Sequence, residues 1–436
     1  MPTPIRSPRT ATVLTTCLAA AAGLALTLGP GPAAGARPVV PDPEGAELIG
    51  FASLPADTFV PGSERSGSFT TNAGVPFGGQ PVQGFSGIHA LGGGDYLVMS
   101  DNGFGAKANS QDFQLRVHRI TPDPTTGTIA VRTGGFVLSD PDARVAFPLW
   151  RDGACSTAAS AGTLPAGYTC PARDRILTGW DFDLESMQVG SDGTFWFGEE
   201  FGPFLLHTDA RGRLLEAPVP TPGVRSPSNV TLAPGEQANL ANSKGFEGMA
   251  ISPNGHHLYP MLEGPTAEDV AAGRASDLRI FEVRTGQGRR ATAFTGAQWR
   301  YRLDSPAHAI GDLIAINKHQ FLAIERDNGS GPTAVFKRIF LLDSRDRDKD
   351  GYVDKRLLVD LMKLPNPEGL GGFGTTFTFP YVTIEDVDIL DEETIAVLND
   401  NNYPATGGRG VGVKDVNEFL RIRLDAPLDV DERLLP

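Results

Sequence analysis

The stretch KGFEGMAISPNGHHLYPMLEG, residues 244–264, decides the fold of this chain. It opens near an acidic residue, alternates apolar residues with period two, turns at Pro-Asn-Gly and closes on a second carboxylate after another apolar run. Alternation with period two predicts a strand, and an Asn-Gly turn between two such runs predicts a β-hairpin. The stretch therefore predicts a hairpin that carries a carboxylate at each free end.

The same hairpin pattern occurs five times along the chain. The copies run from Ser86 to Asp101, Glu185 to Glu200, Glu247 to Glu263, Asp312 to Asp327 (with Glu325 just before), and Glu385 to Asp400. A third apolar strand with a central arginine follows most copies, at Arg116, Arg279, Arg338 and Arg421. Repeated units of three or four antiparallel strands predict a β-propeller. At about 65 residues per repeat, we predict an all-β propeller of about six four-stranded antiparallel blades, within a range of five to seven.

The N-terminal segment has the pattern of a secretion signal. Arg6 and Arg9 precede an apolar stretch at 13–28, and Ala34-Gly35-Ala36 is a small-x-small cleavage site. No later stretch reaches the roughly 20 apolar residues that span a bilayer. We therefore predict a secreted, extracellular protein without a membrane span. Its expected organisation is a signal peptide at 1–36 cleaved near Ala36, a linker at 37–45 and one large domain at 46–436.

Charge and cysteine content narrow the partners and the compartment. The formal net charge is −14, which argues against nucleic acid because phosphate binding needs a basic surface. An anionic small molecule is not excluded as a ligand, since bound divalent cations reverse the local charge. Cys155 and Cys170 most simply form one disulfide in an oxidising compartment, with a metal site or a catalytic thiol as the alternative. They lie in the long first interval between repeats, where we expect an insertion.

The carboxylates of the repeats are predicted to meet. In a propeller, the innermost strand of each blade starts on the face where the second strand ends, so opening and closing residues converge on one rim of the channel. Crowded carboxylates repel one another unless cations or raised pKa values relieve them, and dense oxygen ligands suit Ca²⁺ or Mg²⁺. The predicted metal ligands are Asp101, Glu185, Glu200, Glu247, Glu263, Asp312, Glu325, Asp327, Glu385 and Asp400. The alternative is that these acids accept hydrogen bonds from backbone N–H groups and close the blade turns.

A separate acidic turn has the spacing of a calcium loop. The ligand pattern D-x-D-x-D-G-x-x-D is made by Asp346, Asp348, Asp350, Tyr352 and Asp354, with Gly351 at the tight turn. Leu357 stands where an EF-hand has its bidentate Glu, so an EF-hand is excluded. We expect an ion-stapled hairpin with a structural role, against a solvated acidic turn.

Motifs of nucleophilic hydrolases are missing. The chain contains no G-x-S-x-G, H-E-x-x-H, C-x-x-C or P-loop sequence. His89 and Arg116 are the predicted substrate-binding residues. For Arg116 and the equivalent arginines of the other repeats, the favoured alternative to substrate binding is an ion pair with the predicted ring of repeat carboxylates.

Several segments also resemble those of a known family. Residues 198–205 (GEEFGPFL) resemble its EEYGP signature, residues 244–255 its GLEGLAISPDG segment, residues 324–327 (IERD) its LERD phrase, and residues 397–402 (VLNDNN) its VNDN phrase. The family is the phytase-like, "esterase-like activity of phytase", family, and the resemblance runs from about Gly84 to Asp425. It implies an exported propeller that hydrolyses phosphate esters or other esters. The chain lacks the Asp-Asp-Pro-Ala phrase of the β-propeller phytases, and its first repeat opens with Ser86 rather than an acid.

Three functions follow as hypotheses. The first is a metal-dependent hydrolase of phosphate esters that uses Ca²⁺, or alternatively Mg²⁺, with Glu200 and Glu247 as candidate general bases and Arg326 as a cationic helper. The second is a hydrolase of carboxylic esters or lactones that uses the same ion. The third is a propeller that only binds a ligand or a partner protein. For the enzymes, we expect a small-molecule ester as partner, preferentially an anionic one; the oligomeric state stays open.

Overall fold

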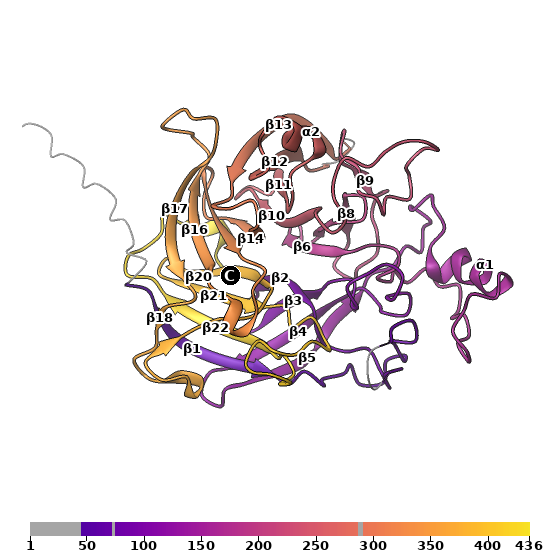
Figure 1. The fold of residues 1–436 in the computed structure, drawn as a ribbon, viewed down its shortest axis with the longest axis horizontal. Coiled ribbons are helices and arrows are strands. Elements are labelled where there is room, and N and C mark those ends of the chain that lie inside the picture. The colour runs from indigo at the N-terminus through magenta and orange to yellow at the C-terminus, as the bar shows by residue number, and fades with distance from the viewer. Residues whose placement is uncertain (1–44, 72–74, 287–290) are drawn as a thin grey trace, which may run out of the picture. The chain divides into compact units, whose positions relative to one another are not determined.

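The computed structural model describes residues 45–71, 75–286 and 291–436 of the chain (Figure 1). The predicted signal peptide and all of the predicted linker except Gly45 lie outside these residues. Across the described ranges, no helix has both the length and the apolar character needed to cross a bilayer.

Four-stranded antiparallel sheets repeat along the chain, in agreement with the predicted fold class. The first sheet contains β2 (Phe85–Ala90), β3 (Tyr96–Ser100), β4 (Arg116–Asp123) and β5 (Thr128–Val137), and the second contains β6 (Leu184–Val189), β7 (Phe195–Glu199), β8 (Phe204–Thr208) and β9 (Val219–Pro220). The third contains β10 (Phe246–Ile251), β11 (His257–Leu262), β12 (Asp277–Arg284) and β13 (Ala293–Arg302), and the fourth contains β14 (Ala309–Ala315), β15 (Gln320–Arg326), β16 (Lys337–Asp343) and β17 (Asp354–Asp360).

The fifth blade joins both ends of the described chain. It contains β20 (Ile384–Asp391), β21 (Thr394–Asn399), β22 (Asn417–Arg423) and, as its outer strand, β1 (Glu47–Leu54). Strand β1 pairs antiparallel with β22 from Glu47↔Arg423 to Leu54↔Asn417. A single parallel pair between Ser53 and Thr128 links the outer edges of the fifth and first blades. This long-range pairing closes the propeller without a separate terminal blade.

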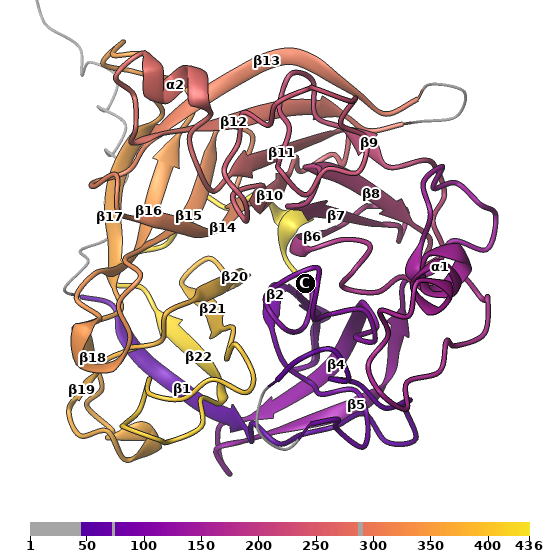
Figure 2. The same cartoon turned by 45° about the vertical axis from the view of Figure 1, so that its right-hand side comes forward.

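The inner strands of the blades form a closed ring. Strands β2, β6, β10, β14 and β20 each contact the next in this order, and β20 contacts β2 (Figure 2). In the part of the chain that the structure describes, the ring has five members, which is the lower end of the predicted range. Dividing the chain length by about 65 residues per repeat predicted a sixth blade, but the residues assigned to that blade lie in connections between strands instead. One of them, between β17 and β20, holds the short pair β18 (Leu364–Pro365) and β19 (Thr376–Phe377).

Neighbouring blades are held together by apolar side chains and by close backbone approach. Met99 and Val117 of the first blade share a buried cluster with Met187 and Phe197 of the second. Glycine is required where inner strands meet. A Cβ on Gly311 would lie 1.9 Å from the backbone oxygen of the adjacent strand β20. These contacts set the relative position of the inner-strand ends, where the candidate site lies.

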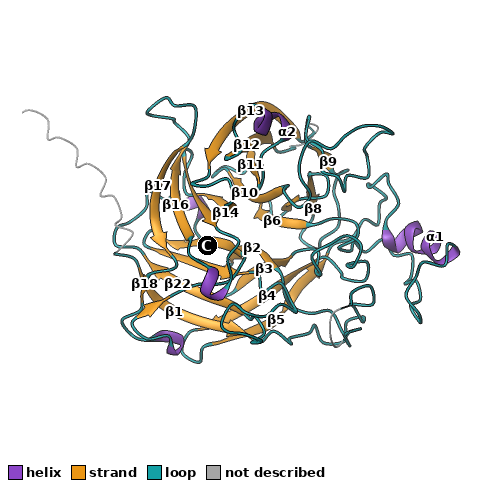
Figure 3. Cartoon of the chain, in the orientation of Figure 1, coloured by secondary structure: helices purple, strands orange, loops and turns teal. Residues whose placement is uncertain are grey.

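The helices are short and lie among the connecting loops (Figure 3). The interval between β5 and β6 holds the π-helical turn η1 (Trp150–Ala154) and α1 (Cys155–Ser160), and the predicted Cys155–Cys170 disulfide is confirmed there. Helix α2 (Ala267–Ala271) begins after Thr266, whose hydroxyl accepts a hydrogen bond from the Asp269 N–H at 3.3 Å, as expected of an N-cap. Three 3₁₀ turns complete the helical elements of the described residues: η2 (Gly331–Thr333), η3 (Leu370–Gly372) and η4 (Glu432–Leu434).

Candidate functional site

A β-bulge lies near the start of every inner strand. The pairing register of β6 with β7 shifts between Leu184 and Ser186, so Glu185 is the extra residue, and the same shift occurs at Glu247 of β10 and Glu385 of β20. A bulge leaves its extra residue out of the hydrogen-bonded ladder and re-aims the side chain. All three glutamates line one cavity at this end of the strands.

The residues that end the second strands complete the rim. Each of these residues comes directly after the second-strand residue that pairs beside the bulge, and each lines the cavity. They are Asp101, Glu200, Glu263 and Asp400. The fourth blade departs from this pattern. Its register shift falls at Gly311, and Arg326 stands at the closing position. The fourth blade therefore contributes a cation where its neighbours contribute carboxylates.

The cavity has a volume of about 230 Å³. Among the described residues that line it are eight carboxyl groups and two cationic side chains. The carboxyl groups belong to Asp101, Asp183, Glu185, Glu200, Glu247, Glu263, Glu385 and Asp400, and the cations are Lys244 and Arg326. The excess of acids leaves a strongly negative site.

The two cations compensate only one side of this rim. The Arg326 Nη2 donates to Glu263 at 3.1 Å, to Glu247 at 3.2 Å and to Glu385 at 3.3 Å. Lys244 forms a further ion pair with Glu263. Because Arg326 is buried and shared by three carboxylates, it holds their positions relative to one another.

Two groups of rim carboxylates have the spacing of metal ligands, and only one of them contains ion-pair partners of Arg326 and Lys244. Ligand oxygens of Asp183, Glu185 and Glu200 lie within 4.8 Å of one another, as do those of Glu200, Glu247 and Glu263. Oxygens bound to one Ca²⁺ at 2.3–2.6 Å lie at most about 5 Å apart. Asp183 Oδ1 is buried and has no hydrogen-bond partner among the described residues. Glu200 belongs to both groups, and one of its oxygens also accepts from the Gly245 N–H at 2.9 Å.

The electrostatics of the rim favour cation binding. Burial, reinforced by neighbouring carboxylates, raises the pKa of Glu185, Glu200 and Glu247 well above the usual range. Burial raises the pKa of Asp183 to about 6. Protons and cations are alternative ways to relieve such repulsion, so a divalent ion would displace protons from these groups.

Two acids of the fourth repeat lie away from the cavity. Asp312 accepts a hydrogen bond from the Val387 N–H at 3.0 Å, which joins β14 to β20 across two blades. Asp327 accepts from the N–H groups of Val335 and Phe336 at 2.8 and 2.9 Å. Both therefore act as backbone acceptors, the alternative that the sequence left open. The one-residue difference in register at Gly311 is the reason, since a shift by one residue turns a side chain to the other face of a strand.

Glu325 is also turned away from the rim. Its carboxylate accepts hydrogen bonds from the Tyr301 hydroxyl and from the Asp304 N–H, and it forms an ion pair with Lys355. Glu325 precedes Arg326 in β15, and neighbouring residues of a strand face opposite sides. We therefore leave Asp312, Glu325 and Asp327 out of the proposed metal site.

The two predicted substrate-binding residues lie outside the cavity lining. His89 pairs with Leu97 and lies three residues along β2 from Ser86, about 10 Å from the rim at the usual rise per residue. Arg116 donates to the Gln114 side chain at 3.0 Å. Of the four equivalent arginines, Arg279 and Arg338 pair with the local acids Asp269 and Asp360 rather than with the ring.

Asp183 is the carboxyl group of the cavity that the sequence analysis missed. It lies two residues before Glu185, and alternate residues of an extended segment share a face. The Asp181-Phe182-Asp183-Leu184-Glu185 pattern is the signal that could have found it.

The predicted calcium loop joins β16 to β17 and brings three of its five residues together. Ligand oxygens of Asp346, Asp348 and Asp354 lie within 4.8 Å of one another, and Asp346 Oδ1 is buried with no partner among the described residues. Asp350 Oδ2 lies 3.6 Å from Arg302 Nη1, within an ion pair. The Tyr352 hydroxyl donates to Asp277 at 2.8 Å, which ties the loop to the third blade.

We expect the Asp346→Asn and Asp354→Asn double variant to lose one of the calcium-binding events of the wild-type protein. Two of the three clustered oxygen donors then lose their charge, while the carboxylate rim is untouched. A saturated site at a hundredfold excess over its Kd stabilises a protein by about 2.7 kcal/mol. Isothermal titration calorimetry and thermal unfolding with added Ca²⁺ measure both effects. The exposed turn variant Asp391→Asn is the control, and an unchanged calcium stoichiometry in the loop variant would contradict the expectation.

Comparison with known proteins identifies the family to which the chain belongs. Residues 80–403, well over half of the chain, match the family model described as "Phytase-like: Esterase-like activity of phytase". Over 104 residues the chain is 28% identical to a protein of Arthroderma benhamiae described as an uncharacterized secreted protein, and the match covers 20% of each. The chain thus spans about one fifth of that relative.

Solved structures with a similar arrangement include regucalcin, a calcium-binding protein of Agrobacterium tumefaciens. That match has 9% identity and a TM-score of 0.37, and it covers 79% of this chain and 92% of the other. A luciferin-regenerating enzyme matches with 9% identity and a TM-score of 0.34, covering 80% and 81% of the two chains.

Proposed function

This chain belongs to the phytase-like family, whose model is described as "Esterase-like activity of phytase", and on that basis we propose that it is a calcium-dependent hydrolase of phosphate esters. The observation that carries the proposal is the group of Asp183, Glu185 and Glu200 in one cavity. The two cations of the cavity, Lys244 and Arg326, form their ion pairs with other carboxylates. Ca²⁺ suits their hard oxygen donors, with Mg²⁺ as the alternative.

Asp183, Glu185 and Glu200 would hold the ion, and Asp101 and Asp400 lie on the same rim. A divalent ion bound there supplies charge that offsets an anionic phosphate and lowers the pKa of bound water. Without it, the excess of carboxylates would repel such a substrate. We propose the phosphate ester over a neutral ester because an anionic group gains most from this reversal of charge.

Glu247 is the proposed general base, with Glu200 as the alternative. Burial beside other carboxylates raises the Glu247 pKa, which favours proton uptake by this carboxylate. Arg326 holds Glu247 in place at 3.2 Å and supplies a fixed positive charge in the cavity. We assign it a positioning role, because its Nη2 atom is already shared by three carboxylates.

Secretion is part of the proposal. The Cys155–Cys170 disulfide is typical of proteins in oxidising compartments, and the relative from Arthroderma benhamiae is described as secreted. The signal peptide at 1–36, which lies outside the described residues, would direct export of the domain at 46–436.

A substrate panel with and without calcium tests the function. The panel contains p-nitrophenyl phosphate, inositol hexakisphosphate, p-nitrophenyl acetate and a γ-lactone, each assayed in EGTA and after Ca²⁺ or Mg²⁺ is restored. We expect calcium-dependent release of phosphate. Turnover of the acetate or the lactone alone would favour the carboxylic ester hydrolase. Absence of turnover on every substrate with calcium bound would favour a binding propeller.

A further inference from the structure

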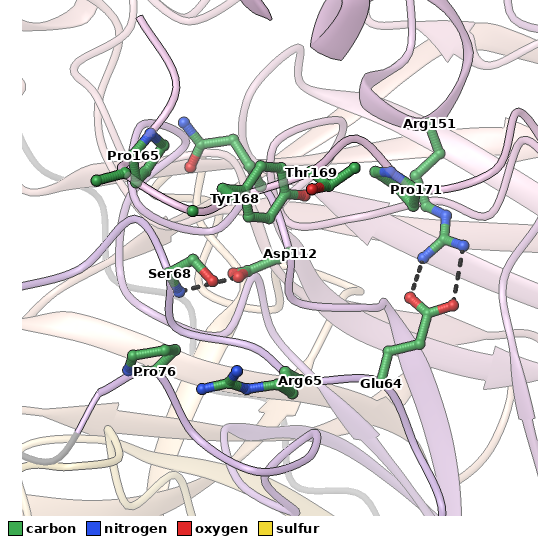
Figure 4. Close-up of a pocket in the computed structure, with 13 residues that line it drawn as sticks. Glu64, Arg65, Ser68, Pro76, Asp112, Arg151, Pro165, Tyr168, Thr169 and Pro171 are labelled. Carbon is green, nitrogen blue, oxygen red and sulfur yellow. Dashed lines mark hydrogen bonds and ion pairs between the residues drawn. The ribbon is translucent and has the colours of Figure 1, made fainter.

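A second cavity, of about 590 Å³, lies between residues 64–68 with Pro76 on one side and the loop closed by the Cys155–Cys170 disulfide on the other (Figure 4). Its lining shares no residue with that of the carboxylate cavity. Pockets for small molecules typically enclose about 300–1,000 Å³. The proposed hydrolysis uses neither this pocket nor the disulfide.

Opposite charges along the pocket offset one another. Arg151 has a side chain only 4% exposed and forms ion pairs with Glu64 and Asp174, and Figure 4 shows its two contacts with Glu64. Asp112 accepts from the Ser68 N–H at 2.9 Å, and Arg65, which also lines the pocket, supplies a positive charge. Because positive and negative side chains balance, the lining favours a neutral ligand over an anion or a cation.

One wall offers an aromatic ring in a fixed orientation. Tyr168 contacts the Phe69 ring edge to face, with centroids 4.6 Å apart. The Trp150 indole N–H donates to the Tyr168 hydroxyl at 3.2 Å, so the tyrosine keeps its own proton for a ligand. The disulfide at Cys170 anchors this wall two residues further along. A ring with an apolar face and a polar tip suits a ligand that has both kinds of surface.

Gln111 supplies a hydrogen-bond acceptor that has no donor. The residue is 9% exposed and lines the pocket. Its Oε1 atom has no hydrogen-bond partner among the described residues. A buried acceptor without a donor costs about 1–3 kcal/mol, and a ligand hydroxyl would remove that cost.

We propose that this pocket binds a neutral saccharide of one or two sugar units. A sugar ring combines hydroxyl donors, which Gln111 Oε1 lacks, with an apolar C–H face that packs on Tyr168. The volume, the balanced charges and the rigid aromatic wall all fit this class of ligand. The site is independent of the proposed hydrolysis, although both cavities meet one loop: Asn102 and Gly105 line the carboxylate cavity, whereas Gln111 and Asp112 line the saccharide pocket.

Saturation-transfer NMR on the full chain tests the proposal. The probes are glucose, galactose, mannose, N-acetylglucosamine, maltose and cellobiose, together with inorganic sulfate as an anionic probe. We expect at least one sugar to bind the wild-type protein. Binding should be at least about tenfold weaker in Gln111→Leu, which removes the acceptor at similar volume, and in Tyr168→Ala.

The matched control is Gln237→Leu, the same substitution at an exposed position, which should bind the sugar as the wild type does. Calcium-dependent turnover should be unchanged in Gln111→Leu. The proposal is overturned if no sugar of the panel binds, if binding survives unchanged in Gln111→Leu, or if sulfate binds more tightly than every sugar. Should Tyr168→Ala fail to fold, the Gln111→Leu result decides alone.

Discussion

Replacing Glu200 and Glu247 together by glutamine is expected to reduce turnover of the preferred ester by about a thousandfold or more and to remove calcium from the rim. Glu200 belongs to both groups of clustered carboxylates, so its neutralisation weakens either arrangement of ligands. Glu247 is the proposed base, and a glutamine amide cannot accept the proton. The measurements are kcat with saturating Ca²⁺ and calorimetric calcium binding.

The fold of this variant should persist, because glutamine keeps the shape of glutamate and Arg326 keeps Glu263 and Glu385 as partners. Without calcium, its melting temperature should therefore stay close to that of the wild type. The matched control is Glu392→Gln with Glu393→Gln, which makes the same change of charge in the exposed turn between β20 and β21. Equal activity of the ring variant and this control would place the chemistry elsewhere in the molecule.

The free energy of unfolding of the calcium-free protein is expected to fall as the pH rises from about 4 to about 8. Burial raises the pKa of Asp312 from 3.8 to about 8. Between these values the folded protein keeps a proton that the unfolded chain releases, so each step up in pH favours unfolding. The loss is complete above the folded pKa and amounts to a few kcal/mol for a group with a shift of this size. Burial raises the pKa of six rim carboxyl groups in the same direction: Asp101, Glu185, Glu200, Glu247, Glu385 and Asp400.

Urea unfolding in EGTA at pH 5, 6, 7 and 8 measures this dependence. The Asp312→Asn variant lacks the titrating carboxyl and should show a shallower decline, whereas the exposed Asp391→Asn control should follow the wild type. Added calcium should flatten the curve as well, because the ion favours the ionised rim. Stability that stays level or increases from pH 5 to pH 8 would be incompatible with buried, protonated carboxyl groups.

The sequence was sufficient for features that depend on local chemistry. Period-two apolar runs and tight turns marked the first two strands of all five blades, and the five copies of the hairpin correspond to the five inner strands of the described chain. The Cys155–Cys170 disulfide was predicted from two cysteines that lie close together in the sequence. Division of chain length by repeat length suggested about six blades, because connections such as the one before β6 are longer than in an average repeat.

Only the tertiary structure decided which side chains face the cavity. The bulges at Glu185, Glu247 and Glu385 follow from pairing with the second strand, and a pattern of period two does not show where an extra residue enters. In the fourth blade that register places Gly311 and Arg326 at the rim, and it turns Asp312 toward a neighbouring strand. Local residue patterns thus determine that a strand forms, whereas the side of the strand that meets the channel is set by contacts between segments far apart in the chain.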